Sequence, residues 1–204
     1  MDFRLSADQG DLVQAVDKLA EQFASKPTEF RGFALYGEEL DKELQDAQYF
    51  DIAQVPELGP LCAAMAVERL AQLPYAAETA LSMLVRPQLS GDWPRPFAVV
   101  EDGRPGRFVA KAATIIVIRG DDIGLVKPAA GDVQAVESLL AYPMGKLQPG
   151  AKSTQLSADD AANVRKWLRV ALAAEISGLL QAAIASTVDH LRSEERRVGK
   201  ECLE

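Results

Sequence analysis

Residues 171–180 read Ala-Leu-Ala-Ala-Glu-Ile-Ser-Gly-Leu-Leu, and they lie in the middle of one long apolar segment. Apolar residues recur from Val164 to Leu191, and Ser157-Ala158-Asp159-Asp160 offers a helix start before them. A helix of that extent is on the order of 50 Å long. Its apolar positions are spread more widely than one stripe, so the helix needs neighbours on more than one side. We therefore expect a homo- or hetero-oligomer formed through this helix.

The first 88 residues predict a helical bundle. Ser6-Ala7-Asp8-Gln9 fits a capping box, in which the Ser hydroxyl and the Gln side chain each bond to the other's backbone N–H. Apolar residues then recur at three- and four-residue spacing from Leu12 to Phe23, and Pro27 ends the pattern. Further helices are expected at 38–48, 61–73 and 76–85.

Prolines and glycines between Arg86 and Pro96 mark a change of character. Short β-rich runs follow at 97–100, 107–110, 114–118, 124–127 and 133–136, with Asp102-Gly103 and Gly120-Asp121-Asp122 as turns. The sequence predicts an α+β chain that is mostly α. Its parts are a helical domain at 1–88, a small antiparallel β-domain at 92–150, and a long C-terminal helix at 156–192.

Composition limits the classes of function. The 204 residues are 48% hydrophobic and carry a net charge of -8, which disfavours binding to nucleic acid or to an anionic bilayer. Cys62 and Cys202 form no disulfide framework, so a reducing cytoplasm is expected. No N-terminal leader pattern and no uninterrupted apolar run of about 20 residues is present, so we expect no membrane span.

The order of these parts resembles that of acyl-CoA dehydrogenases. Leu5-Ser6-x-x-Gln9 looks like the opening of that family, Val55-Pro56-Glu57-Leu58-Gly59 like its loop before the third helix, and residues 171–190 like the first helix of its C-terminal domain. The resemblance covers residues 1–192. It implies α,β-dehydrogenation of an acyl-CoA thioester with FAD as cofactor, the acyl group being fatty or steroidal.

The sequence departs from the family at the flavin site. The family's β-domain carries a Thr-Glu-x-x-x-Gly-Ser-Asp phrase, which is missing here; the chain between Tyr75 and Phe97 is too short for it, and Ala130-Gly131-Asp132 falls too late. The family's Arg-x-Gln-Phe-Gly motif would begin four residues after His190, where Glu194 stands. A glutamate there would repel a pyrophosphate. We expect that this chain alone does not bind FAD.

The catalytic base is also missing from this sequence. In the family branch that places its glutamate on the long helix, the base precedes an arginine by one position and a helix glycine by ten. Counting back from Gly178 gives Leu168, followed by Arg169. Leucine cannot take a proton. In the other branch the resemblance implies a base beyond this chain, so no catalytic residue is assigned and the chain alone is expected to be inactive.

The tail at 193–204 has a different origin. The run from Arg192 to Cys202 resembles the translation of a sequencing adapter, and Leu203-Glu204 looks like a restriction-site scar. A solvated, charged helix end is the alternative. We exclude this tail from the fold prediction.

Single residues that could carry chemistry also have structural interpretations. Glu175 is a candidate buried acid but is expected at a solvent or subunit face, and His190 is expected to complement a helix dipole. Cys62 is expected in the core. Gly178 costs about 1 kcal/mol in a helix, which indicates close approach of another backbone. Trp93 and Trp167 are expected to fill core, with flanking of a flavin ring as the alternative, and no metal site is expected because the chain has one histidine.

Three hypotheses for the function follow. The chain is part of a catalytic flavoprotein subunit, or a non-catalytic partner subunit of a heteromeric acyl-CoA dehydrogenase, or a helical oligomerisation fragment. The shortened β-domain favours the second hypothesis, and family-level frequency favours the first.

Overall fold

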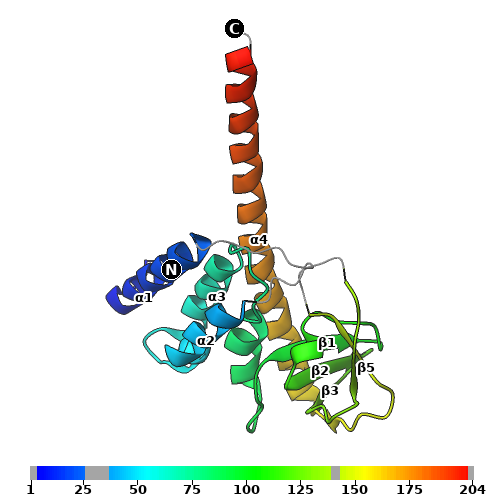
Figure 1. The fold of residues 1–204 in the computed structure, drawn as a ribbon. Coiled ribbons are helices and arrows are strands. Elements are labelled where there is room, and N and C mark those ends of the chain that lie inside the picture. Colours follow the sequence, from blue (N-terminus) through cyan, green and yellow to red (C-terminus); the bar gives the residue numbers. More distant parts are fainter. Residues whose placement is uncertain (1–3, 26–36, 139–142, 202–204) are drawn as a thin grey trace.

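A computed structural model describes residues 4–25, 37–138 and 143–201, with side chains up to Ser193. The N-terminal helices form one layer, a small sheet forms another, and the first half of the last helix runs between them (Figure 1). The second half of that helix extends beyond both layers as a rod (Figure 1). Cys202 and the rest of 202–204 lie outside the described residues.

The helical elements are α1 (Ala7–Ala24), α2 (Glu38–Asp46), the 3-10 helix η1 (Tyr49–Gln54), α3 (Gly59–Leu70), the π-helix η2 (Leu81–Val85), the 3-10 helices η3 (Arg86–Gln88) and η4 (Val109–Lys111), and α4 (Ala158–Glu201). The strands are β1 (Phe97–Glu101), β2 (Thr114–Arg119), β3 (Asp122–Val126), β4 (Val133–Ala135), β5 (Gly145–Leu147) and β6 (Thr154–Gln155).

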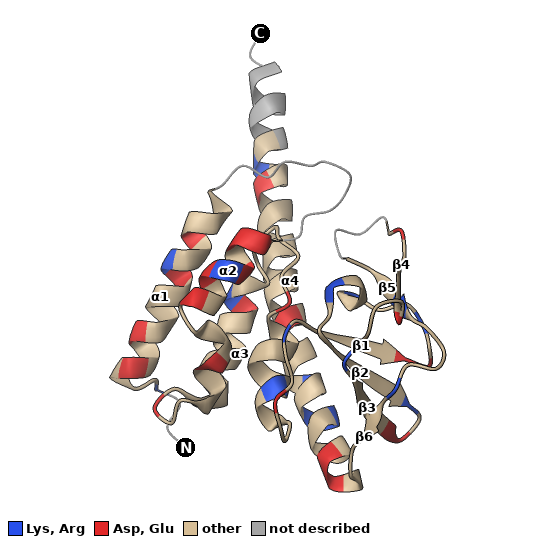
Figure 2. Ribbon diagram, turned by 60° about the horizontal axis from the view of Figure 1, so that its bottom comes forward, with Lys and Arg blue, Asp and Glu red and all other residues tan. Residues whose placement is uncertain are grey.

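The predicted capping box at the start of α1 is confirmed. The backbone N–H of Gln9 donates to the Ser6 hydroxyl at 3.3 Å, and the backbone N–H of Ser6 donates to the Gln9 side chain at 3.0 Å. Val16, Leu19 and Phe23 are the buried residues of α1 and lie on one face of the helix. Acidic residues outnumber basic ones in α1 and α2 (Figure 2).

The expectation of a helix at 76–85 is only partly right. The helix begins at Ala80, and its middle is the π-helical turn η2. The side chain of Glu78 accepts hydrogen bonds from the backbone N–H groups of Leu81 and Ser82, at 3.0 and 3.1 Å. The helix therefore starts just after this carboxylate, because the carboxylate satisfies N–H groups that a helix leaves open at its start.

The expected antiparallel sheet is wrong in one pair of strands. The sheet has the order β1-β2-β3-β6, and β1 pairs parallel with β2, with Phe97 opposite Thr114. The other two pairs are antiparallel. The segment after β1 crosses back along the sheet, so β2 starts beside the start of β1. The predicted strand at 107–110 is wrong as well, because Phe108 has a left-handed φ of 63° and η4 follows it in this crossover.

A second sheet consists of β4 and β5, paired antiparallel with Val133 opposite Leu147. The strand predicted at 133–136 is confirmed as β4. The strands β5 and β6 were not predicted, because their two or three residues are too short to show a periodicity.

Close contact of α4 with α3 is confirmed at Gly178, which is buried. A Cβ atom at Gly178 would lie 2.1 Å from the backbone oxygen of Glu68 and 2.9 Å from Cβ of Ala71. Ser177 and Gln181 donate to the Glu68 carboxylate at 2.6 and 2.7 Å. This contact fixes the position of α4 on the helical layer.

The helix α4 is 44 residues long and begins at the predicted cap, where the Asp160 N–H donates to the Ser157 hydroxyl at 3.2 Å. Beyond Gly178 it exposes large apolar side chains, namely Leu179, Leu180, Ile184, Val188 and Leu191. By length and composition alone, the stretch Ala158–Ser193 is long and apolar enough to cross a membrane, although no such span was expected. Its first half packs against α3, η2 and β3 within the chain.

Candidate functional site

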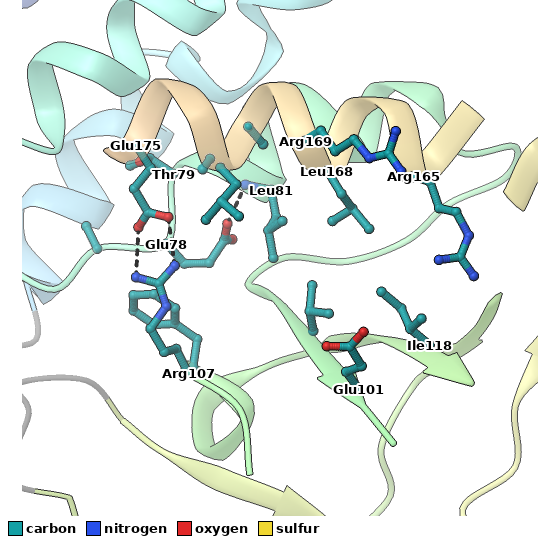
Figure 3. A pocket seen from close by; sticks show the side chains of 16 residues that line it. Glu78, Thr79, Leu81, Glu101, Arg107, Ile118, Arg165, Leu168, Arg169 and Glu175 are labelled. Carbon is teal, nitrogen blue, oxygen red and sulfur yellow. Dashed lines mark hydrogen bonds and ion pairs between the residues drawn. The ribbon is translucent and has the colours of Figure 1, made fainter. Parts of the chain in front are cut away.

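A cavity of about 400 Å³ lies where α4, the segment 77–81 and the sheet meet (Figure 3). One wall is the face of α4 that carries Arg165, Leu168, Leu172 and Glu175, which recur at three- and four-residue spacing. The opposite wall is the sheet, and Arg107 with the Phe108 ring closes one end. The cavity thus lies at the junction of the helical layer, the sheet and α4.

The strand β1 supplies alternate side chains to this cavity. Val99 and Glu101 line it, whereas Ala98 and Val100, which alternate with them along the strand, are buried on the other side of the sheet. Glu101 is the last residue of β1 and lies opposite Ile118 of β2, which also lines the cavity. The strand period therefore places one carboxylate at the edge of an otherwise apolar sheet wall.

Glu78 is the most buried carboxylate at this junction, with 2% of its surface exposed. Besides the two N–H groups of η2, it accepts hydrogen bonds from the Ser82 hydroxyl and from the Phe97 N–H, the latter at 2.9 Å. Burial raises the pKa of Glu78 above its ordinary value, although these hydrogen bonds and the charge of Arg95 act in the opposite direction. Glu78 thus joins η2 to β1, and its oxygens are already occupied.

Arg95 holds the same junction from outside the cavity. Its guanidinium donates to both carboxylate oxygens of Asp41, at 2.7 and 3.2 Å, and lies 3.2 Å from the centroid of the Phe50 ring. It also donates to the Glu78 carbonyl at 3.3 Å. One side chain therefore connects α2, η1 and the segment before η2.

The expectation for Glu175 is wrong. Its side chain is only 14% exposed and forms a two-pronged pair with Arg107, with N–O distances of 2.7 and 3.1 Å (Figure 3). This pair links α4 to the crossover between β1 and β2. Glu175 is therefore a wall residue of the cavity rather than a residue of a solvent or subunit face.

Leu168, which stands at the alternative position of the family's base, lines the cavity opposite Glu101 and Ile118 (Figure 3). Its apolar side chain occupies the part of α4 from which a carboxylate would reach a ligand. Arg169 lines the cavity beside it, and Arg165 donates to the Gly120 carbonyl. That the chain has no catalytic base stays a prediction.

The other residues named from the sequence lie away from the cavity. Cys62 is 1% exposed in the core, as expected, and burial raises the pKa of its thiol. His190 is exposed on the far half of α4. Trp93 and Trp167 are half-buried and pack against the core, and neither lines the cavity. Among the described residues, no group of three or more His, Cys, Asp or Glu side chains could hold a metal ion.

Sequence reasoning missed the roles of Glu78, Arg95 and Arg107. The partners of each lie far along the chain: 19 residues separate Glu78 from Phe97, and 68 separate Arg107 from Glu175. A single available signal was the acidic residue in the first turn of the helix expected at 76–85, where a carboxylate such as that of Glu78 is favourable.

The residues around the cavity do not fit FAD by themselves. A pyrophosphate requires several open N–H donors. Arg107 is held by Glu175 and Arg165 donates to a backbone carbonyl, which leaves Arg169 as the single lining arginine with no side-chain partner among the described residues. The carboxylates of Glu78, Glu101 and Glu175 add negative charge to the same walls. A volume of about 400 Å³ is also near the lower end of the range for small-molecule sites.

Several solved structures share this fold. The chain superposes on the ChsE4–ChsE5 complex from Mycobacterium tuberculosis with a TM-score of 0.59 and 18% identity, covering 93% of this chain and 68% of that one. For a variant of a steroid acyl-CoA dehydrogenase, the TM-score is 0.62 at 18% identity, with coverage of 91% and 66%. For butyryl-CoA dehydrogenase from Megasphaera elsdenii, the TM-score is 0.58 at 16% identity, with coverage of 93% and 70%.

The chain therefore has the fold of acyl-CoA dehydrogenases, over roughly two thirds of the length of these proteins. No protein-family model and no curated protein matches its sequence. The likeness is one of fold, because the identities are below 20%.

Proposed function

We propose that this chain is a subunit of an acyl-CoA dehydrogenase-type flavoprotein, and that it is the non-catalytic subunit of a heteromeric assembly. The observation that supports the proposal best is that α4 offers no open carboxylate to the cavity and that Glu78 and Glu175 are already bound within the chain. α4 presents Leu168 to the cavity, Glu78 is occupied by four hydrogen-bond donors, and Glu175 is paired with Arg107. A general base requires an open carboxylate within reach of its proton.

Glu101 is the remaining cavity carboxylate, and it lies at the exposed edge of the sheet wall. An exposed carboxylate stays in contact with water, whereas a reacting thioester is held in a site that excludes water. A structural role for this chain in a heteromeric assembly therefore accounts for the cavity better than catalysis of dehydrogenation by this chain.

The exposed apolar side chains of α4 support a partner chain. Leu180, Ile184 and Leu191 are 57%, 64% and 58% exposed, although leucine and isoleucine are mostly buried in globular proteins. A contiguous apolar surface of this kind marks an interaction site. The ChsE4–ChsE5 complex, by its name, contains two different chains, which favours a heteromer.

The partner is proposed to complete the flavin site. The cavity of this chain lacks the open donors that FAD requires, so FAD would be held by residues of the partner or shared across the contact. The substrate proposed for the assembly is an acyl-CoA thioester, with a fatty or a steroidal acyl group.

The test is to purify the chain alone and together with a second acyl-CoA dehydrogenase-type chain encoded beside it. Each preparation is examined by its visible spectrum, by sedimentation, and by reduction of an electron-accepting dye on addition of acyl-CoA. We expect a colourless, inactive chain alone and a yellow, active heteromer with a fixed subunit ratio.

Two results would overturn the proposal. The chain alone could purify with stoichiometric FAD and oxidise an acyl-CoA, which would make it a catalytic subunit. Alternatively, it could form a stable homo-oligomer that neither binds FAD nor joins the second chain. This result would favour the hypothesis that the chain is a helical oligomerisation fragment.

A further inference from the structure

Four of the charged groups in the walls of the cavity are satisfied within the chain. Glu78 accepts four hydrogen bonds, Arg107 and Glu175 pair with each other, and Arg165 donates to the Gly120 carbonyl. A ligand that relied on any of these groups would first have to break a contact in a partly desolvated site, which is costly.

Between these groups the cavity is apolar. The residues Leu81, Val99, Ile118, Leu168 and Leu172 line it, and Leu168 lies opposite Ile118 (Figure 3). Apolar walls of this kind favour a hydrocarbon body over a polar one, because each apolar surface gains by leaving water.

Glu101 differs from the other carboxylates. It faces the cavity opposite Leu168 (Figure 3), and its side-chain carboxylate has no hydrogen-bond or ion-pair partner among the described residues. An ionised carboxylate only accepts hydrogen bonds, so its natural complement is a ligand group with an O–H or N–H to donate.

We propose that this cavity binds an uncharged, mainly apolar molecule whose hydroxyl group donates a hydrogen bond to Glu101. This goes beyond the proposed subunit role, because the carbonyl of an acyl thioester can only accept. A ligand carboxylate at the same place would be repelled by Glu101. A ligand ammonium would be attracted by Glu101, but Arg165 and Arg169 line the same end and oppose this attraction, so a neutral donor suits the mixed charges there.

The experiment compares three ligands that share one hydrocarbon chain, namely decanol, decanoate and decylamine. The full chain is loaded with the neutral, apolar dye N-phenyl-1-naphthylamine, and each ligand is titrated until the dye fluorescence is lost. We expect decanol to displace the dye at a concentration about ten-fold lower than either charged ligand, the difference expected for a hydrogen bond to a charged group.

Two substitutions test the role of Glu101. In Glu101→Leu, decanol should lose its ten-fold advantage and decanoate should bind more tightly, because the repelling charge is gone. Glu57→Leu, which changes an exposed glutamate outside the cavity, should leave the order of the three ligands unchanged.

A second pair of variants locates the dye, because the exposed side chains of α4 could also bind it. Leu168→Trp places an indole ring in the cavity and narrows it, so it should strongly weaken dye binding, whereas Leu180→Trp, about three turns further along α4, should retain it. Circular dichroism of each variant shows that it is folded. The proposal is overturned if decanoate binds best in the wild type, if Glu101→Leu leaves the preference unchanged, or if Leu168→Trp retains the dye.

Discussion

Gly178 of α4 lies against the backbone carbonyl of Glu68 in α3, so closely that a methyl group at Gly178 would stand 2.1 Å from that oxygen. Ser177 and Gln181, on either side of Gly178 along α4, donate to the side chain of the same glutamate. The backbone and the carboxylate of Glu68 are thus both in contact with α4, and only glycine leaves room for this crossing.

Gly178→Ala should therefore destabilise the chain, even though alanine is the better helix former. We expect a loss of about 1–3 kcal/mol in the free energy of unfolding, which is typical of overpacking. Urea denaturation followed by circular dichroism measures it. The matched control is Gly10→Ala in α1, where a Cβ would meet no atom within 4 Å and where we expect a gain of about 0.5–1 kcal/mol. Equal effects at both sites would contradict the crossing.

Glu78 should make stability depend on pH in an unusual direction for an acid. Burial raises its pKa above the ordinary value of 4.5, so the folded chain holds this proton more tightly than the unfolded chain. The contribution of Glu78 to the free energy of unfolding is thus fully present below pH 4.5, and it is lost as pH rises through the raised pKa. The free energy of unfolding of the wild type, relative to Glu78→Gln, should fall over that range.

The measurement is urea denaturation of both proteins from pH 4.5 to 8. Glu57→Gln, at an exposed glutamate before α3, serves as the control for a change of charge alone. A difference between wild type and Glu78→Gln that stays constant with pH, or rises, would rule out the predicted linkage.

The pair of Arg107 and Glu175 should stabilise the contact between α4 and the crossover of the sheet. A double-mutant cycle with Arg107→Gln and Glu175→Gln should give a coupling of about 1 kcal/mol, because the geometry is two-pronged and Glu175 is largely buried. The control cycle uses Lys111 and Glu38, which are 3.5 Å apart and are 51% and 73% exposed, and its coupling should be below about 0.5 kcal/mol. Equal coupling energies in the two cycles would show that the pair of Arg107 and Glu175 does not stabilise the contact between α4 and the crossover.

The apolar surface of α4 should cause association of the purified chain. Wild-type protein should sediment as a dimer or larger species at micromolar concentration, and Ile184→Lys should shift it toward the monomer, because a charge at a 64% exposed apolar position opposes burial. Ser186→Lys adds the same charge two residues away, on the other side of the helix, and should leave the association unchanged. A wild-type monomer across this concentration range would count against the surface.

The helices could be predicted because their signals are local. The capping box of Ser6 and Gln9 and the apolar stripe of α1 need only neighbouring residues, and Gly178 was informative because glycine is costly inside a helix. The order of the helical, sheet and α4 parts could be predicted from such local patterns along the chain.

The sheet and the cavity could not be predicted to the same extent. Asp102-Gly103 after β1 looks like the turn of a hairpin, but it leads into the crossover that makes β1 and β2 parallel. The periodicity of a strand does not show whether it pairs in parallel or antiparallel. The partner of Glu175 lies 68 residues away in the sequence, so its burial depends on tertiary contacts that no local pattern records. The domain boundaries and the absence of a base remain predictions.

The contact of α3 with α4 also bears on how the chain folds during its synthesis. Glu68 and Ser177 are 109 residues apart in the sequence. The side of α3 that packs against α4 therefore stays exposed to solvent until α4 has emerged from the ribosome. In a nascent chain halted at Gly150, α1 and α3 should be loosely packed and should bind chaperones. The helical layer should reach its native packing only after Gln181 has emerged from the ribosome.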